Sequence, residues 1–101
     1  MTENSDEGNK SADVMLVPTL EFYERSYAKS CDGNDQKALL TFKNYESKEK
    51  LRRLQAELQW VKESRVSEVV CDRVIGKKRK SRHQSYEHWA KLMLLWIVSK
   101  R

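Results

Sequence analysis

The sequence is short of the residues that build turn-rich or disulfide-bonded folds. Its 101 residues include one proline, three glycines and two cysteines. So few prolines and glycines argue against a β-sandwich or barrel, which need many tight turns, and favour helices. Cys31 and Cys71 stand alone, without the close spacing of a redox or metal pair. We therefore expect free thiols in a reducing compartment.

Long hydrophobic runs are also missing. The longest, residues 92–98, falls far short of the ~20 apolar residues that cross a bilayer. The N-terminus is acidic, and its apolar run at residues 14–17 is too short for the core of a signal peptide. We expect an intracellular protein of the nucleus or cytoplasm, neither secreted nor transmembrane.

The sequence lacks the motifs of enzymes and metal sites. It has no phosphate loop, no G-x-S-x-G turn, no H-E-x-x-H pair and no dinucleotide-binding fingerprint. His83 and His88 are five residues apart, which places them on different faces of a helix, and neither cysteine has a close partner. We expect a non-enzyme with no catalytic residue, no cofactor and no metal ion.

Charge is plentiful but unevenly distributed. Residues 1–35 carry three Lys/Arg against eight Asp/Glu (net −5), residues 36–75 nine against six (net +3), and residues 76–101 eight against one (net +7). An acidic beginning and a basic end are typical of an interaction protein, or of a head that shields the tail within one chain.

The predicted fold class is all-α, with five segments. We expect a disordered acidic tail, a short apolar segment with a helix and a turn, a long amphipathic central helix, a basic linker, and a C-terminal helix that is apolar and basic. In the apolar segment Thr19 is the candidate N-cap. The five segments cover residues 1–13, 14–33, 34–75, 76–81 and 82–101.

The central helix is predicted from its apolar spacing. Residues 51, 54, 58 and 61 share one helical face, and Asn34 or Asp35 is a suitable N-cap. Residues 46–50 hold nothing apolar, but Glu46–Lys50 and Glu49–Arg53 pairs could carry the helix through. The apolar stripe loses phase near Arg65, so a long or kinked helix is predicted, coiled-coil-like over only two heptads. Gly76 is its natural stop.

The C-terminal helix is predicted to be apolar nearly all round. Ser81 and Gln84 fit a capping box at its start, and Tyr86, Trp89 and Met93 share a face with Trp96 or Ile97. Such a helix needs burial. We expect it either to fold back antiparallel on residues 57–75, as a helical hairpin, or to be held by a partner in an extended molecule.

The sharpest local feature is a basic patch of Lys77, Lys78, Arg79, Lys80 and Arg82. It fits a nuclear localisation signal, and it would equally suit phosphates of nucleic acid or anionic lipid headgroups. The alternative is a solvated loop. Ser81 and Ser85 follow basic residues and are candidate phosphorylation sites, where added phosphate would reduce the positive charge.

Three functions remain open from the sequence. The first is a small helical adaptor or structural protein that binds protein partners through amphipathic helix faces, with homo-oligomers also allowed. The second is a nuclear, charge-driven nucleic-acid or chromatin accessory protein that binds without sequence specificity. The third is a peripheral membrane protein anchored by its C-terminal helix. The predicted interface residues of the adaptor are Leu51, Leu54, Leu58, Trp60, Val61, Trp89, Met93 and Trp96.

Overall fold

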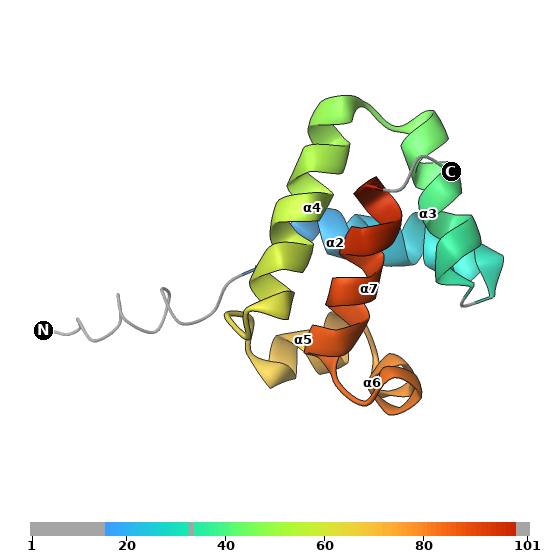
Figure 1. Ribbon diagram of the computed structural model, residues 1–101. Coiled ribbons are helices and arrows are strands. Elements are labelled where there is room, and N and C mark those ends of the chain that lie inside the picture. Colours follow the sequence, from blue (N-terminus) through green and yellow to red (C-terminus); the bar gives the residue numbers. More distant parts are fainter. Residues whose placement is uncertain (1–15, 33, 99–101) are drawn as a thin grey trace, which may run out of the picture.

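The computed structural model describes residues 16–32 and 34–98, and it is built from helices (Figure 1). No strand occurs in these two ranges, which confirms the all-α prediction. The acidic tail predicted for residues 1–13 lies outside the described residues. The helical elements are α2 (Pro18–Tyr23), η1 (Glu24–Ala28), η2 (Lys29–Cys31), α3 (Asp35–Tyr45), α4 (Lys48–Lys62), α5 (Glu68–Val74), α6 (Lys77–His83) and α7 (Tyr86–Val98).

The first helical run passes through three helix types. It is α-helical in α2, π-helical in η1 and 3₁₀-helical in η2, and it ends at Asp32, which is left-handed with φ 57°. Pro18 occupies the first turn, where its missing N–H costs no hydrogen bond. Val17 is the N-cap residue, so the prediction that Thr19 caps this helix is wrong.

The cap of α2 comes instead from a distant part of the chain. Val17 has no side-chain oxygen, and the buried carboxylate of Glu57 in α4 takes its place. Its oxygens accept hydrogen bonds from the backbone N–H of Thr19 at 3.2 Å and of Leu20 at 2.7 Å. A negative charge also suits the positive end of a helix dipole. The start of α2 therefore depends on its docking against α4.

The long central helix predicted over residues 34–75 is wrong, because this range forms three separate helices, α3, α4 and α5. Its start and its end were predicted correctly. Asn34 is the N-cap of α3, and its side chain accepts a hydrogen bond from the Lys37 N–H at 3.1 Å. Gly76, with φ 101°, follows the end of α5. The error lies in the two interior breaks.

The first break occurs although both predicted ion pairs form. Both predicted pairs form, Glu46–Lys50 at 3.3 Å and Glu49–Arg53 at 3.0 Å. The backbone is nevertheless extended at Glu46 and Ser47, and the Ser47 hydroxyl caps α4. An exposed i,i+4 pair stabilises a helix by about 0.3–0.5 kcal/mol, whereas a serine N-cap contributes about 1 kcal/mol. The two ion pairs therefore do not require a continuous helix, and the Ser47 cap favours a new helix start.

The second break explains the loss of phase in the apolar stripe. Ser64 is left-handed, with φ 61°. The Ser64 N–H donates to the Val61 carbonyl at 3.0 Å and the Arg65 N–H to the Trp60 carbonyl at 2.9 Å. These two bonds form a Schellman motif, which ends α4 with a serine at the position that glycine usually takes. Ser67 then caps α5.

The stretch predicted as a basic linker, residues 76–81, lies largely within helix α6. Ser81 is inside this helix, so the predicted capping box with Gln84 is wrong. Gln84 has φ 77° and separates α6 from α7. The cap of α7 is Ser85, whose hydroxyl accepts a hydrogen bond from the His88 N–H at 3.0 Å.

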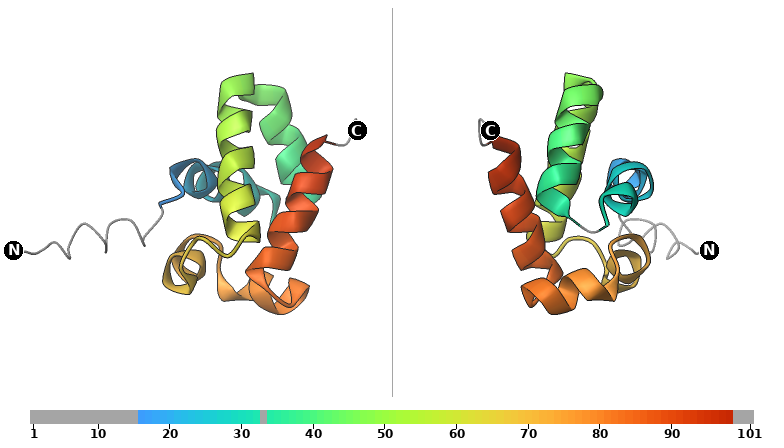
Figure 2. Two further views of the ribbon diagram at one scale, coloured as in Figure 1. Left: turned by 60° about the vertical axis from the view of Figure 1, so that its left-hand side comes forward. Right: turned by 90° about the vertical axis from the view of Figure 1, so that its right-hand side faces the viewer.

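The core lies between α4 and α7, which run side by side in opposite directions (Figures 1 and 2). α7 also packs against α3, while α2 packs against α4 and η1 against α3. The expected fold-back of the C-terminal helix thus occurs, along α4 rather than along residues 57–75 as a whole. The most deeply buried side chains are Leu20, Tyr23, Leu39, Phe42, Leu54, Leu58, Val61, Trp89 and Met93.

An aromatic cluster joins α3 to the first helical run. The Phe42 ring meets those of Phe22, Tyr23 and Tyr27 edge-on, with centroids 6.3, 5.9 and 5.2 Å away. Edge-to-face pairs at such distances stabilise by about 0.5–1.5 kcal/mol each beyond their buried area. This cluster fixes α3 against η1, and so positions the outer surface of α3.

Replacing Glu57 with alanine is expected to lower the free energy of unfolding by about 1–3 kcal/mol, because two buried N–H groups lose their acceptor. Glu57→Gln retains an acceptor and should lose less. Urea denaturation followed by far-UV circular dichroism measures both. Glu49→Ala, at an exposed position of the same helix, is the control and should change stability by less than ~0.5 kcal/mol. Equal losses for Glu57→Ala and Glu49→Ala would contradict the capping role.

Candidate functional site

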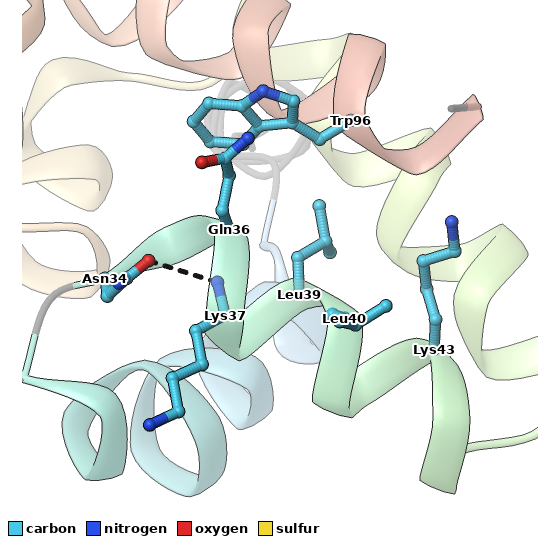
Figure 3. Close-up of a pocket in the computed structure, with 7 residues that line it drawn as sticks. All are labelled: Asn34, Gln36, Lys37, Leu39, Leu40, Lys43 and Trp96. Atoms are coloured by element: carbon cyan, nitrogen blue, oxygen red, sulfur yellow. Dashed lines mark hydrogen bonds between the residues drawn. The ribbon is translucent and has the colours of Figure 1, made fainter. Parts of the chain in front are cut away.

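The best candidate for a binding site is a groove between α3 and α7, which we call the α3–α7 groove (Figure 3). It has a volume of about 540 Å³. Most of its lining comes from α3, and α7 contributes one large side chain. The lining residues are Asn34, Gln36, Lys37, Leu39, Leu40, Lys43 and Trp96.

The floor of the groove is apolar. Leu39 is buried beneath it, Leu40 is 47% exposed, and the indole of Trp96 is half-buried. Figure 3 shows Leu39 and Gln36 projecting from α3 toward the Trp96 ring. A leucine and a tryptophan left partly in water beside a hollow offer apolar area to a second molecule.

The rim of the groove carries positive charge and amides, with no carboxylate among its lining residues. Lys43 closes one end, where its Nζ donates to the carbonyl oxygen of Ile97 at 3.0 Å. This bond satisfies a carbonyl in the last turn of α7. Lys37 and Gln36 are exposed on α3. The electrostatic character of the groove therefore favours an acidic ligand.

Apolar surface continues beyond the groove along the outer side of α7. Leu95 is 55% exposed and Val98 65% exposed. The opposite face of this helix, including Trp89 and Met93, is buried in the core. The all-round apolar character seen in the sequence thus divides into a core face and an uncovered outer face.

The structure places most of the predicted interface residues in the protein's own core. Leu54, Leu58, Val61, Trp89 and Met93 are at most 1% exposed, so they hold the fold and offer nothing to a partner of the folded chain. Of the eight, the three that remain partly accessible are Leu51, Trp60 and Trp96. Only Trp96 lines the groove.

The five residues of the predicted basic patch differ in burial and in their partners. Arg79 is buried, and Lys80 is paired with Glu68. Lys77, Lys78 and Arg82 are exposed on α6. The patch thus contains one buried arginine, one lysine in a surface ion pair and three further side chains that are exposed.

Arg79 is the centre of a buried charge cluster. Its Nη1 lies 3.0 and 2.9 Å from the two carboxylate oxygens of Glu24, and its Nη2 lies 2.7 Å from Asp35 Oδ1. Asp35 also accepts hydrogen bonds from the Tyr23 hydroxyl at 2.8 Å and from Trp89 Nε1 at 2.9 Å. The cluster therefore connects η1, α3, α6 and α7.

Burial sets the electrostatics of this cluster. It raises the pKa of Glu24 to about 7, although Arg79 and its hydrogen bonds act to lower it. Burial, together with the Asp35 charge, also raises the pKa of Tyr23. For Arg79 burial acts to lower the pKa, but Glu24 and Asp35 outweigh it and the pKa is raised. Shifted pKa values often mark active sites, but they also arise in structural ion-pair networks. Because the polar groups here bond to one another, a structural ion-pair network is enough to explain the shifted pKa values.

The two candidate phosphorylation sites differ in their surroundings. Ser81 is exposed on α6 and lines a shallow hollow with Lys77, Lys78 and Arg82. Ser85 caps α7 through its hydroxyl. A phosphate on Ser81 would meet three cations, whereas modification of Ser85 would first disturb a helix start.

Other kinds of site find no support among residues 16–32 and 34–98. Cys31 and Cys71 are free thiols, and no group of three His, Cys, Asp or Glu side chains in this part of the chain could hold a metal ion. None of the described helices is both long enough and apolar enough to cross a membrane.

Comparisons with known proteins identify no relative. No protein-family model, no curated protein and no solved structure matches this chain significantly. Any function must therefore be argued from the groove and the surface charges themselves.

Sequence reasoning missed most of the α3–α7 groove. Ala38, Leu39 and Phe42 form the buried face of α3, whereas Leu40 is offset from that face and 47% exposed. A leucine on the otherwise polar side of a helix is a signal that could have been used. The pairing of α3 with Trp96, more than fifty positions away, carries no local signal.

Replacing Arg79 with methionine is expected to lower the free energy of unfolding by about 3–5 kcal/mol, because the buried carboxyl groups of Glu24 and Asp35 would lose their charge partner. Denaturant unfolding measures the loss, and exposed Lys78→Met is the control. Combining Arg79→Met with Glu24→Gln and Asp35→Asn should recover part of the stability. A single variant as stable as the control would contradict the role of the cluster.

The pKa of Glu24 predicts a dependence of stability on pH. Glu24 titrates at about 7 in the folded chain, against an ordinary value of 4.5. Between these values the folded state holds a proton that the unfolded state has released, so this contribution to stability is lost as the pH rises through about 7.

Glu24→Gln should remove that part of the pH dependence. We would compare urea midpoints of the two proteins between about pH 5 and about pH 8, a range that spans the raised pKa. The difference between the proteins is the informative quantity, because both contain the same histidines. Parallel pH profiles would contradict the raised pKa.

Proposed function

We propose that this protein is a small, non-enzymatic helical interaction module that binds a partner protein in the α3–α7 groove. The observation that carries the proposal is an apolar floor bordered by cations and amides without a carboxylate. The occupant that we infer is an amphipathic helix with acidic residues beside its apolar face.

The floor supports binding through apolar anchors. Leu40 and Trp96 are both partly exposed at the hollow, and tryptophan is among the residues that dominate protein interfaces. Fully burying one leucine-sized side chain stabilises a complex by about 1.5–3 kcal/mol. A volume of about 540 Å³ accommodates a few such side chains rather than a whole peptide. The partner would therefore insert anchors and lie along the surface.

The charges support an acidic partner. Lys37 and Lys43 are the charged residues of the lining. Lys91 lies on the exposed side of α7, along which the apolar surface continues through Leu95. Charge complementarity of this kind increases the rate of association and rejects basic competitors. It also makes binding weaken as salt is added.

The helical form of the partner is supported by the shape of the surface. Two helices, α3 and α7, border the groove, and the apolar surface of α7 extends it. A helix presents anchors at steps of three and four residues, which suits a groove between two helices. An extended strand would leave its backbone groups unpaired here, since no sheet edge occurs in the described residues.

The membrane alternative draws less support from the structure. The tryptophan-rich face that was expected to enter a lipid surface contains Trp89 and Met93, and both are completely buried. Inserting that face would require α7 to leave the core. Only the outer face, with Leu95 and Val98, could contact lipid without unfolding.

A synthetic peptide tests the proposal. The probe is an amphipathic helix with leucines on one face and glutamates elsewhere, and it should shift the NMR signals of Leu40 and of the Trp96 indole. Leu40→Glu should weaken binding at least about tenfold, because it removes an anchor and repels the peptide. Val69→Glu makes the same kind of change on α5, at a position 76% exposed, and should bind like the wild type.

Two outcomes of these peptide experiments would contradict the proposal. Equal weakening by Leu40→Glu and Val69→Glu would show that charge alone attracts the peptide. A peptide with lysines in place of the glutamates should not bind. If it binds as tightly as the acidic one, the charge preference of the groove is refuted.

A further inference from the structure

A second hollow lies between the first helical run and α6. Its volume is about 490 Å³. It brings together cationic side chains from segments that are about fifty positions apart in the sequence. Its lining residues are Glu24, Arg25, Ala28, Lys29, Asp32, Ile75, Lys78, Arg79 and Arg82.

Positive charge dominates this hollow. Its carboxylates are Glu24, which is paired with Arg79, and Asp32. Arg25 has only a weak exposed contact to Glu21, at 4.0 Å. Lys29 and Lys78 are exposed. The lining of this hollow thus contains five cationic side chains and two carboxylates.

The charge extends into a neighbouring shallow hollow. This hollow is lined by Lys77, Lys78, Ser81 and Arg82, so the two share Lys78 and Arg82. Together they form a continuous surface, which we call the basic band, of Arg25, Lys29, Lys77, Lys78 and Arg82. A band over two adjacent hollows matches a ligand with several phosphates better than it matches one small anion.

We infer that the basic band binds the phosphate backbone of double-stranded nucleic acid without sequence specificity. Single strands are usually held by bases stacking on aromatic side chains, and neither hollow has an aromatic residue in its lining. Neither lining contains the amide side chains that read adenine edges. What the band offers is charge at fixed positions, and phosphate contacts position a protein without reading sequence.

A lipid headgroup surface is the less favoured ligand for the band. Peripheral membrane binding by a cationic surface normally combines charge with apolar side chains that enter the bilayer. The apolar residues lining these hollows are Ala28 and Ile75, and both are buried. The exposed apolar side chains Leu95 and Val98 belong to α7 and line neither hollow.

Fluorescence anisotropy of the full chain with a labelled duplex of about 20 base pairs tests the inference. Two unrelated sequences should bind with equal affinity. The logarithm of the binding constant should fall linearly with the logarithm of salt concentration, with a slope of about −4 to −5 for one phosphate contact by each of the five cations of the band. Lys29→Gln combined with Lys78→Gln should make this slope less steep by about 2, one for each lost contact.

A matched control separates the band from net charge. Lys48→Gln combined with Arg52→Gln removes the same charge from exposed positions at the start of α4, far from α6 (Figure 1). This variant should keep the wild-type affinity and slope. Equal losses in both double variants, or no binding to duplex at low salt, would overturn the inference. So would tighter binding to anionic lipid vesicles or to polyglutamate than to duplex.

Discussion

The fold depends on one buried guanidinium. Arg79 forms ion pairs with both Glu24 and Asp35, and through Asp35 it is linked to the hydroxyl of Tyr23 and the indole of Trp89. Two carboxylates and an arginine removed from water are costly unless every charge is paired, and here each finds a partner. The cluster fixes α6 against η1, α3 and α7 at once. Without this cluster, the short and highly charged helix α6 would not remain packed against the other helices.

The sequence allowed the helical class, the buried faces and the outer helix boundaries to be predicted. Leu54, Leu58 and Val61 are buried as their spacing indicated, and Asn34 caps α3. The two breaks between α3, α4 and α5 were not predicted, because each depends on a small local conformational preference. The Ser47 hydroxyl caps the start of α4, and the left-handed backbone of Ser64 ends this helix. Serine is common inside helices as well as at their ends, so its identity alone does not locate a break.

The site was much less predictable than the fold. Within a run of five cations nothing distinguishes Arg79 from its neighbours, because its partners Glu24 and Asp35 are 55 and 44 positions away. The same holds for Glu57, which caps α2 from 37 positions away along the chain. Tryptophans were predicted as interface residues from composition, yet Trp89 completes the core. Long-range polar contacts leave no periodic signal in a sequence.

The cluster also links stability to the surface charge. Helices as short as α6, with seven residues, do not form in isolation because nucleation is unfavourable. The cations of Lys78 and Arg82 therefore have fixed positions only while Arg79 holds α6 in place. Since Lys29 and Arg25 belong to the run that begins with α2, their positions depend likewise on the Glu57 cap. A change in either buried carboxylate contact would thus disperse the basic band without touching any residue in it. Two buried interactions, rather than the charges themselves, determine whether this surface exists.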